Sequence, residues 1–206
     1  MIHVIDHPLV RHRIRILRNR ETPPHKFRET VKEITGFLAY EALRDLHTVA
    51  EPVLTPLMET TGDRIDEPVT IVPILRAGLG MSDALQAILP SAKVGVLGMQ
   101  RNEETAEPMP YYAKLPKREA NERAILIDPM LATGGSACDA LSQLKKSGYT
   151  RILFLSIISA PEGVARVERE HPEVPIYTAA LDQRLNEQFY ILPGLGDAGD
   201  RIFGTL

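Results

Sequence analysis

The 206-residue sequence has little of several features that mark particular classes of protein. It contains a single cysteine, Cys138, and no tryptophan. One cysteine excludes an internal disulfide and favours a reducing compartment. Long apolar runs are also absent, since the longest, residues 152–158, falls far short of the ~18–20 residues that cross a bilayer. We therefore expect a soluble, cytoplasmic protein with no membrane partner.

A strong excess of one charge is absent as well. Lys and Arg total 24 against 27 Asp and Glu, which gives a formal net charge of −3. General nucleic-acid binders carry a strongly basic surface, so no nucleic-acid partner is expected. Hydrophobic residues make up 44% of the chain and charged residues 25%, a globular composition. At ~100–200 residues per domain, we expect residues 1–206 to form a single domain.

The first part of the chain, residues 1–60, carries a helical pattern. Apolar residues recur every three or four positions from Phe27 to Leu46, which traces one face of a helix. A shorter helical stretch, residues 9–17, has several arginines close together, which we interpret as a solvated or subunit-contacting face. This amphipathic N-terminal part predicts a homo-oligomer, either a dimer or a dimer-based tetramer.

From residue 69 onward, short apolar runs alternate with helical patterns. This alternation predicts an α/β fold with a mostly parallel central sheet and flanking helices. Pro73 lies inside the first run and predicts a strand end or a sheet edge there. The runs lie at residues 69–75, 94–99, 124–127, 152–158 and 174–179.

Two segments do not fit this alternation. Residues 102–121 are polar and interrupted by prolines, which in a compact domain indicates a disordered segment or a functional lid. The C-terminal tail has four glycines within residues 194–204.

The clearest chemical signal is the segment 125–136. A buried strand is expected to end at Asp128, and the sequence Thr133-Gly134-Gly135-Ser136 then opens a helix. Backbone N–H groups in such a loop converge on one point, and the helix N-terminus favours an anion there. A capped helix after a glycine turn is the alternative interpretation. The carboxylate at the strand end favours a phosphate-binding site.

This segment resembles the 5-phospho-α-D-ribose 1-diphosphate (PRPP) signature of type I phosphoribosyltransferases. Its spelling, Asp-Pro-Met-Leu-Ala-Thr-Gly-Gly-Ser, is similar to that of the family's uracil-specific branch. Residues 73–80 resemble the diphosphate-binding loop of that branch, residues 101–108 the start of its mobile lid, and residues 190–201 its uracil-binding segment. The likeness covers essentially the whole chain.

The resemblance implies a type I phosphoribosyltransferase-like α/β fold. Its parts would be a helical N-terminal segment (1–60), a mobile lid (102–121) and a C-terminal base-binding hood (182–206). The implied reaction converts uracil and PRPP to UMP and diphosphate in pyrimidine salvage. A non-proline cis peptide bond at the diphosphate loop is also implied.

The resemblance further implies which residues form the site. Uracil would bind at Ile191, Gly196, Asp197 and Ala198. Asp128, Asp197 and Arg101 would take the catalytic roles. The implied PRPP-binding residues are Arg76, Arg101, Asp128, Pro129, Met130, Leu131, Ala132, Thr133, Gly134, Gly135, Ser136 and Asp197.

Some positions depart from the family pattern. General type I enzymes place two adjacent acids at the signature, but the second position here is Pro129. We therefore assign no direct metal ligand in this motif, and the cofactor Mg²⁺ would bind mainly through PRPP. The resemblance implies that Asp197 faces PRPP beside the base, directly or through a metal-bound water. Asn102 and Phe189 stand where relatives usually have Asp and Gly, which leaves the path of the tail open at Phe189. GTP activates some relatives, and the sequence leaves open whether it activates this protein.

Other interpretations are weaker. Gly194, Gly196 and Gly199 match a dinucleotide fingerprint, but only seven residues follow, too few for the helix and strand that it requires. The six histidines lack metal-ligand spacing and are expected at the surface. Cys138 lies one turn into the helix, where we expect it to be packed rather than nucleophilic. An RNA-binding regulator and a transferase for another base remain as alternatives.

Overall fold

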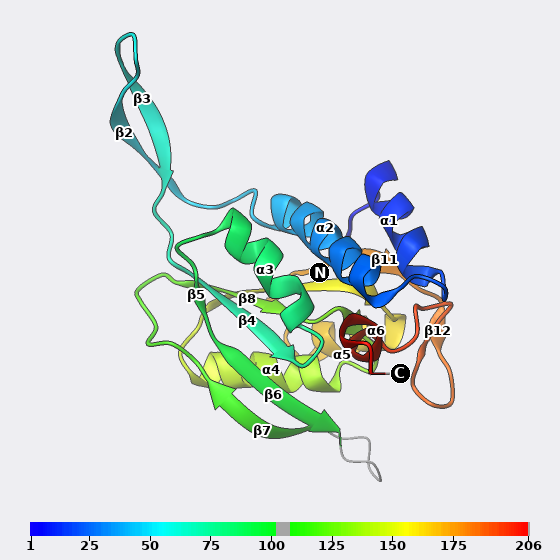
Figure 1. The fold of residues 1–206 in the computed structure, drawn as a ribbon. Helices are drawn as coiled ribbons and strands as arrows, with labels where there is room; N and C mark the ends of the chain where they lie inside the picture. The colour runs from blue at the N-terminus through cyan, green and yellow to red at the C-terminus, as the bar shows by residue number, and fades with distance from the viewer. Residues whose placement is uncertain (102–107, 206) are drawn as a thin grey trace.

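The chain is described from a computed structural model that covers residues 1–101 and 108–205. A nine-stranded sheet runs through the molecule (Figure 1). Its strands are β1 (Ile2–Val4), β4 (Val69–Leu75), β5 (Lys93–Val94), β6 (Val96–Arg101), β7 (Pro108–Lys114), β8 (Arg123–Ile127), β9 (Met130–Leu131), β10 (Arg151–Ser159) and β11 (Ile176–Leu181). The main order is β1-β11-β10-β8-β4-β6-β7, with β5 on β4 and β9 on β10. In this sheet β7 pairs antiparallel with β6, and the other pairings are parallel.

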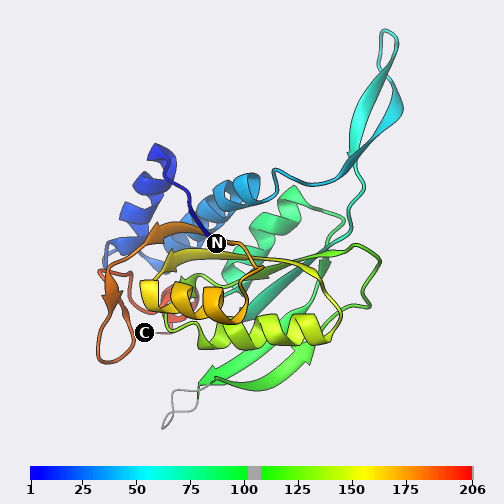
Figure 2. The ribbon, with the colours of Figure 1, turned by 180° about the vertical axis from the view of Figure 1, so that it is seen from behind.

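Helices cover both faces of the sheet (Figures 1 and 2). They are α1 (Pro8–Arg18), α2 (Pro24–Ala42), α3 (Leu79–Ile88), α4 (Gly135–Lys146), α5 (Pro161–Glu170) and α6 (Ala198–Phe203). The first three lie on one face, and α4 and α5 lie on the other. None of the helices in residues 1–101 and 108–205 has the length and apolar character needed to cross a membrane.

The apolar runs form strands that are buried on both faces. In β8, Ile125 and Ile127 belong to the core under α1, α2 and α3, whereas Ala124 and Leu126 belong to the core under α4 and α5. Successive side chains of a strand point to opposite faces, so a strand covered by helices on both sides needs apolar residues at every position. The prediction of a mostly parallel sheet with flanking helices is therefore confirmed.

The expectation for Pro73 is wrong. Pro73 lies inside β4, a central strand, and is paired with Ile127 of β8. On the other side of β4, the pairing passes from β5 at Ile71 to β6 at Ile74. The proline, which has no N–H to donate, thus falls between two hydrogen-bonded ladders, and this placement lets a central strand contain it.

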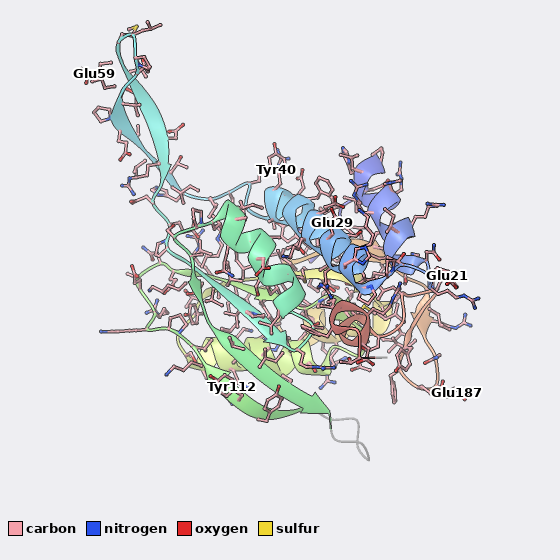
Figure 3. All side chains as sticks on the ribbon, in the orientation of Figure 1. Glu21, Glu29, Tyr40, Glu59, Tyr112 and Glu187 are labelled. Carbon is pink, nitrogen blue, oxygen red and sulfur yellow. The ribbon has the colours of Figure 1, made fainter. Side chains whose placement is uncertain are left out.

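The helical prediction for residues 1–60 is right for α1 and α2 but wrong from residue 48 onward. Residues 48–65 form a two-stranded hairpin of β2 (Thr48–Leu54) and β3 (Glu59–Ile65), which projects away from the rest of the molecule (Figure 1). Side chains extend into open space on both sides of this arm (Figure 3). The arm is rich in β-branched residues, which favour strands. Since neither face is buried, its sequence shows no periodicity that would reveal the strands.

A buried charge cluster lies at the amino-terminal end of the central strands. Arg123, only 5% exposed, donates from Nε to Glu67 Oε1 at 2.6 Å and from Nη1 to Asp45 Oδ1 at 2.6 Å. Glu67 is 7% exposed and also pairs with Arg151 Nη1 at 3.1 Å. These bonds tie the segment between α2 and β4 to the start of β8.

We predict that Arg123→Met lowers the free energy of unfolding by about 2–4 kcal/mol, because the Glu67 carboxylate stays buried after it loses its main partner. Arg64→Met is the matched control, since Arg64 pairs with Glu51 and Asp66 on the exposed arm. Exposed pairs contribute less than about 1 kcal/mol. Urea denaturation measures both variants, and equal losses in the two would contradict the prediction.

Candidate functional site

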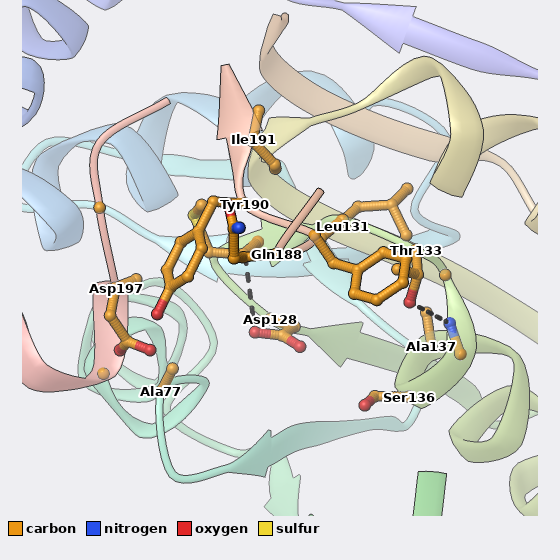
Figure 4. Close-up of a pocket in the computed structure, with 18 of the residues that line it drawn as sticks. Ala77, Asp128, Leu131, Thr133, Ser136, Ala137, Gln188, Tyr190, Ile191 and Asp197 are labelled. Atoms are coloured by element: carbon orange, nitrogen blue, oxygen red, sulfur yellow. Dashed lines mark hydrogen bonds between the residues drawn. The ribbon is translucent and has the colours of Figure 1, made fainter. Parts of the chain in front are cut away.

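The carboxyl-terminal ends of β4 and β8 open into a cavity of about 420 Å³. In Figure 4, Asp197 and Ala77 lie on one side of this cavity and Thr133 and Ser136 on the other, with Asp128 between them. Ligands of open α/β sheets bind at this edge. Three separate segments supply the lining: residues 76–77 after β4, residues 128 and 130–137 after β8, and residues 188–191 with 196–199 of the tail.

The cavity brings together most of the predicted site residues. The four expected at uracil all line it. Of those expected at PRPP, Arg76, Asp128, Asp197 and residues 130–136 line it as well. Pro129 does not; its carbonyl instead accepts the amides of Ile157 and Ile158 of β10. Arg101 ends β6, and its side chain lies outside the described part of the structure, as do residues 102–107 of the expected lid. Of the rest of that lid, residues 108–114 form β7.

The loop before α4 has the geometry of an anion site. Gly134 has a φ of +80°, a left-handed conformation that glycine adopts without strain. The first bond of the helix runs from Cys138 N to Gly134 O at 2.9 Å, so the amides of Ser136 and Ala137 precede the helical ladder. Both residues line the cavity. The loop therefore presents backbone donors and a helix N-terminus to the same space.

Sequence reasoning missed Gly163 of α5, which supports this loop from behind. A Cβ at Gly163 would lie 2.4 Å from Ala132 O and 3.0 Å from Leu131 O. A Cβ at Gly134 would in turn lie 2.9 Å from Gly163 O. Any side chain here would push the loop into the cavity. The available signal was a glycine in the first turn of a helix, where it weakens the helix unless packing requires it.

The loop after β4 begins with a cis peptide bond between Leu75 and Arg76, which confirms the expectation. The Arg76 side chain is directed to α6. Its Nη2 lies 3.3 Å from Asp200 Oδ1, and its guanidinium carbon lies 5.5 Å from the centre of the Phe203 ring. Arg76 is thereby held at the mouth of the cavity, with a charge available to an anionic ligand.

Asp128 and Asp197 place two carboxylates on the same cavity. Burial raises the pKa of Asp128 to about 7, the amide of Met130 opposes this rise, and the charge of Asp197 adds to it. The side chain of Asp197 caps α6, since Oδ1 accepts the amide of Asp200 at 2.9 Å. Carboxylate oxygens are ligands that Mg²⁺ prefers, so each side chain has the chemistry to contribute to a magnesium site at this cavity.

Phe189 lies at a tight turn in the tail, in a backbone conformation that glycine adopts without strain. Its φ is +62°, a left-handed conformation that is unusual for a bulky residue. The turn is held by Asn186, whose Oδ1 accepts the amides of Gln188 at 3.0 Å and Tyr190 at 2.8 Å. This turn joins β12 (Arg184–Leu185) to β13 (Ile191–Leu192). Phe189 therefore adds an aromatic side chain to the cavity wall.

A second group of side chains lies away from this cavity, among the described residues. Cys138, Glu170 and His171 are close enough to surround an ion. Cys138 is 3% exposed, which confirms that it is packed, and burial raises the pKa of its thiol to about 12, which disfavours the nucleophilic thiolate. The surface prediction for His171 is wrong: it is 5% exposed, and its two ring nitrogens lie 3.0 Å from Cys138 O and 2.6 Å from Lys145 Nζ. Since both nitrogens already have partners, the group does not form a ready metal site.

Comparison with known proteins gives consistent matches. A family model described as uracil phosphoribosyltransferase matches residues 4–205. A uracil phosphoribosyltransferase from Dictyoglomus thermophilum is 52% identical over 206 residues, covering 100% of both chains. One from Exiguobacterium sibiricum is 51% identical, covering 99% of this chain and 98% of the relative. A solved structure from Aquifex aeolicus is 40% identical with a TM-score of 0.93 over 98% of each chain. Adenine phosphoribosyltransferase from Trypanosoma brucei, solved with AMP, pyrophosphate and ribose-5-phosphate, shares the fold, with a TM-score of 0.62 and 14% identity over 95% of this chain and 88% of that chain.

The raised pKa of Asp128 predicts how stability changes with pH. A carboxyl with a pKa of about 7 when folded and about 4 when unfolded stabilises the protein at low pH. That stabilisation is lost progressively as the pH rises from about 4 to about 7. Asp128→Asn cannot ionise, so between pH 4 and 8 the variant should gain about 2–4 kcal/mol of stability relative to wild type. Urea denaturation of both ligand-free proteins across this range measures the gain. Parallel pH profiles would contradict the assigned burial.

Proposed function

Because the chain belongs to the uracil phosphoribosyltransferase family, we propose that its cavity binds PRPP and uracil next to each other. The family's reaction converts uracil and PRPP to UMP and diphosphate, a step of pyrimidine salvage, and this is the reaction of the chain. The observation that supports the binding arrangement is the cavity itself. The segment with the PRPP signature and the C-terminal tail line it together.

PRPP would be held mainly by main-chain groups and arginines. Residues 133–136 would bind the 5′-phosphate, since backbone amides at a helix N-terminus favour an anion. Asp128 would accept hydrogen bonds from the ribose hydroxyls. Arg76 and Arg101 would hold the diphosphate, because a guanidinium donates two parallel bonds to neighbouring oxygens.

Uracil would be recognised by the backbone of the tail. The base presents an acceptor at O4 and a donor at N3, and main-chain N–H and C=O groups at Ile191, Gly196 and Ala198 offer the complementary pattern. Cytosine presents the opposite pattern at these two atoms. Backbone groups cannot exchange roles, so cytosine would leave buried polar groups unpaired at about 1–3 kcal/mol each.

In this reaction the protein has to position the two substrates and neutralise the charge of the leaving group. The C1–O bond of PRPP breaks to leave a ribosyl centre with oxocarbenium character and release diphosphate. Uracil N1 attacks from the opposite face, and its proton leaves to the departing diphosphate or to water. Asp128 and Asp197 are proposed to orient the ribose and the base edge, and Arg101 to stabilise the charge on the departing diphosphate. Mg²⁺, the proposed cofactor, would be held mainly by PRPP oxygens, with Asp197 beside it directly or through a bound water, and it would neutralise diphosphate charge when bound.

We further propose that the arm of β2 and β3 contacts a second copy of the chain in a dimer or a dimer-based tetramer. Leu54, Leu57 and Met58 at its tip are 82%, 94% and 68% exposed. A projecting hairpin with an exposed apolar tip favours association. The apolar faces of α1 and α2, on which the sequence prediction of an oligomer rested, are instead buried within the chain. Cytoplasmic location and activation by GTP remain predictions.

A spectrophotometric assay with PRPP and Mg²⁺ tests the proposed recognition of the base. We expect UMP from uracil, turnover of 5-fluorouracil, and turnover of cytosine lower by about 10⁴-fold, as for other sites that pair with a specific polar pattern. The same assay with and without GTP tests activation. Cytosine turnover within tenfold of uracil would refute recognition by the backbone.

The close packing behind the loop predicts the effect of a single methyl group. Gly163→Ala should raise the KM for PRPP at least tenfold, because a displacement of the loop by ~1 Å misplaces its amides. Gly36→Ala is the matched control in α2, where the nearest atom to an added Cβ is Ile88 Cδ1 at 4.0 Å. The control should keep the KM and gain about 0.5–1 kcal/mol of stability. An unchanged KM in Gly163→Ala would show that the loop tolerates the shift.

The proposed contact through the arm predicts that charged substitutions at its tip dissociate the oligomer. Leu57→Glu combined with Met58→Glu should reduce the solution mass, measured by light scattering, towards the 22.9 kDa of one chain. Leu9→Glu is the control, since Leu9 is 49% exposed on α1, away from the arm. A wild-type protein that is already monomeric at micromolar concentration would overturn the proposed contact.

A further inference from the structure

The ion pair of Arg18 and Asp182 hydrogen-bonds the backbone N–H and C=O of Gly194, a tail residue beside the proposed uracil site. Arg18, at the end of α1, donates from Nη2 to Asp182 Oδ1 at 2.5 Å and from Nη1 to Asp182 Oδ2 at 2.9 Å. The same Nη1 donates to Gly194 O at 2.9 Å, and Asp182 Oδ2 accepts the amide of Gly194 at 2.9 Å. The Asp182 side chain is only 4% exposed. The peptide groups on both sides of Gly194 are therefore tied to α1.

A second arginine holds the following residue. Arg201 of α6 is 8% exposed and donates from Nη1 to Leu195 O at 2.8 Å and to Leu17 O. Its Nη2 donates to Asn19 O at 2.7 Å, and its guanidinium carbon lies 4.4 Å from the centre of the Phe27 ring. These acceptors are backbone carbonyls. The last turn of α1, the loop at residue 195 and α2 thus meet around one buried guanidinium.

These two sets of hydrogen bonds form two clamps, one made by Arg18 with Asp182 and the other by Arg201. They fix the stretch of backbone between the residues proposed to bind uracil. Gly194 and Leu195 follow β13, which begins at Ile191, and directly precede Gly196. Arg18, Asp182 and Arg201 are not among the residues that line the cavity. They can therefore affect a ligand only through the backbone that they hold. A base recognised by main-chain groups requires that backbone to stay within about 0.5 Å of its place, since no side chain can rotate to compensate.

We propose that Arg18, Asp182 and Arg201 are positioning residues for uracil. They hold the tail backbone in the place where its N–H and C=O groups can hydrogen-bond the base. The proposal rests on the uracil site proposed above. Helix α1 then belongs to the base-binding half of the site, although none of its residues reaches the cavity. Loss of one clamp should weaken uracil binding and leave the PRPP loop, on the other side of the cavity, unchanged.

Steady-state kinetics of Arg18→Lys, Asp182→Asn and Arg201→Lys test this assignment. A lysine keeps the charge but cannot donate the planar set of bonds that the guanidinium makes. We expect the KM for uracil to rise at least tenfold in each variant and the KM for PRPP to change by less than twofold. Arg15→Lys is the matched control, because Arg15 is exposed on the same helix. It should leave both KM values within twofold of wild type.

The split between the two KM values separates positioning from simple loss of fold. KM does not depend on the amount of active enzyme, so partial unfolding would lower the apparent kcat and leave both KM values unchanged. That result, or a parallel rise in both KM values, would overturn the proposal. If Arg18→Lys or Asp182→Asn does not fold at the assay temperature, Arg201→Lys gives the test, and if Arg201→Lys does not fold, the other two give it. If wild type forms no UMP, the proposed function fails; if wild type is active and uracil KM is unchanged in the variants, only the positioning role fails.

Discussion

The site depends on how closely α5 packs against the loop before α4. Gly163 lets the carbonyls of Leu131 and Ala132 approach its Cα, and Gly134 faces the carbonyl of Gly163 in return. This contact leaves no room for a side chain on either partner. It sets the position of the loop more firmly than hydrogen bonds alone, because a backbone in van der Waals contact cannot move towards its neighbour. The positions of the backbone N–H donors of that loop are therefore set by packing that lies outside the cavity.

Buried charge has opposite roles at the two ends of the sheet. At the amino-terminal edge, Arg123 is surrounded by carboxylates and holds the connection into β4. At the carboxyl-terminal edge, Asp128 has the amide of Met130 as a weak partner at 3.5 Å and a second carboxylate nearby. The first arrangement holds the fold together, and the second keeps a group in an unfavourable environment where a ligand can use it. Functional sites often retain such locally unfavourable features.

Much of the architecture could be predicted from the sequence, since strands buried on both faces are continuous apolar runs. The loop 133–136 was also predictable, because all the groups that form this anion site are consecutive in the sequence. The arm of β2 and β3 was not, since an exposed hairpin has no buried face to impose alternation. Gly163, His171 and Arg201 were missed for a related reason. Their roles come from contacts with segments far away in the sequence, and only the folded chain brings these together.

The site joins the two ends of the chain, which has a consequence for synthesis. Among the strands of residues 1–101 and 108–205, β1 pairs with β11 alone, and the end of α1 is tied to residues 182–201. Helix α1 also packs against α2, but its last turn gains these hydrogen bonds only once residues 182–201 have been made. A nascent or C-terminally truncated chain would retain the phosphate loop yet lack a reader for the base.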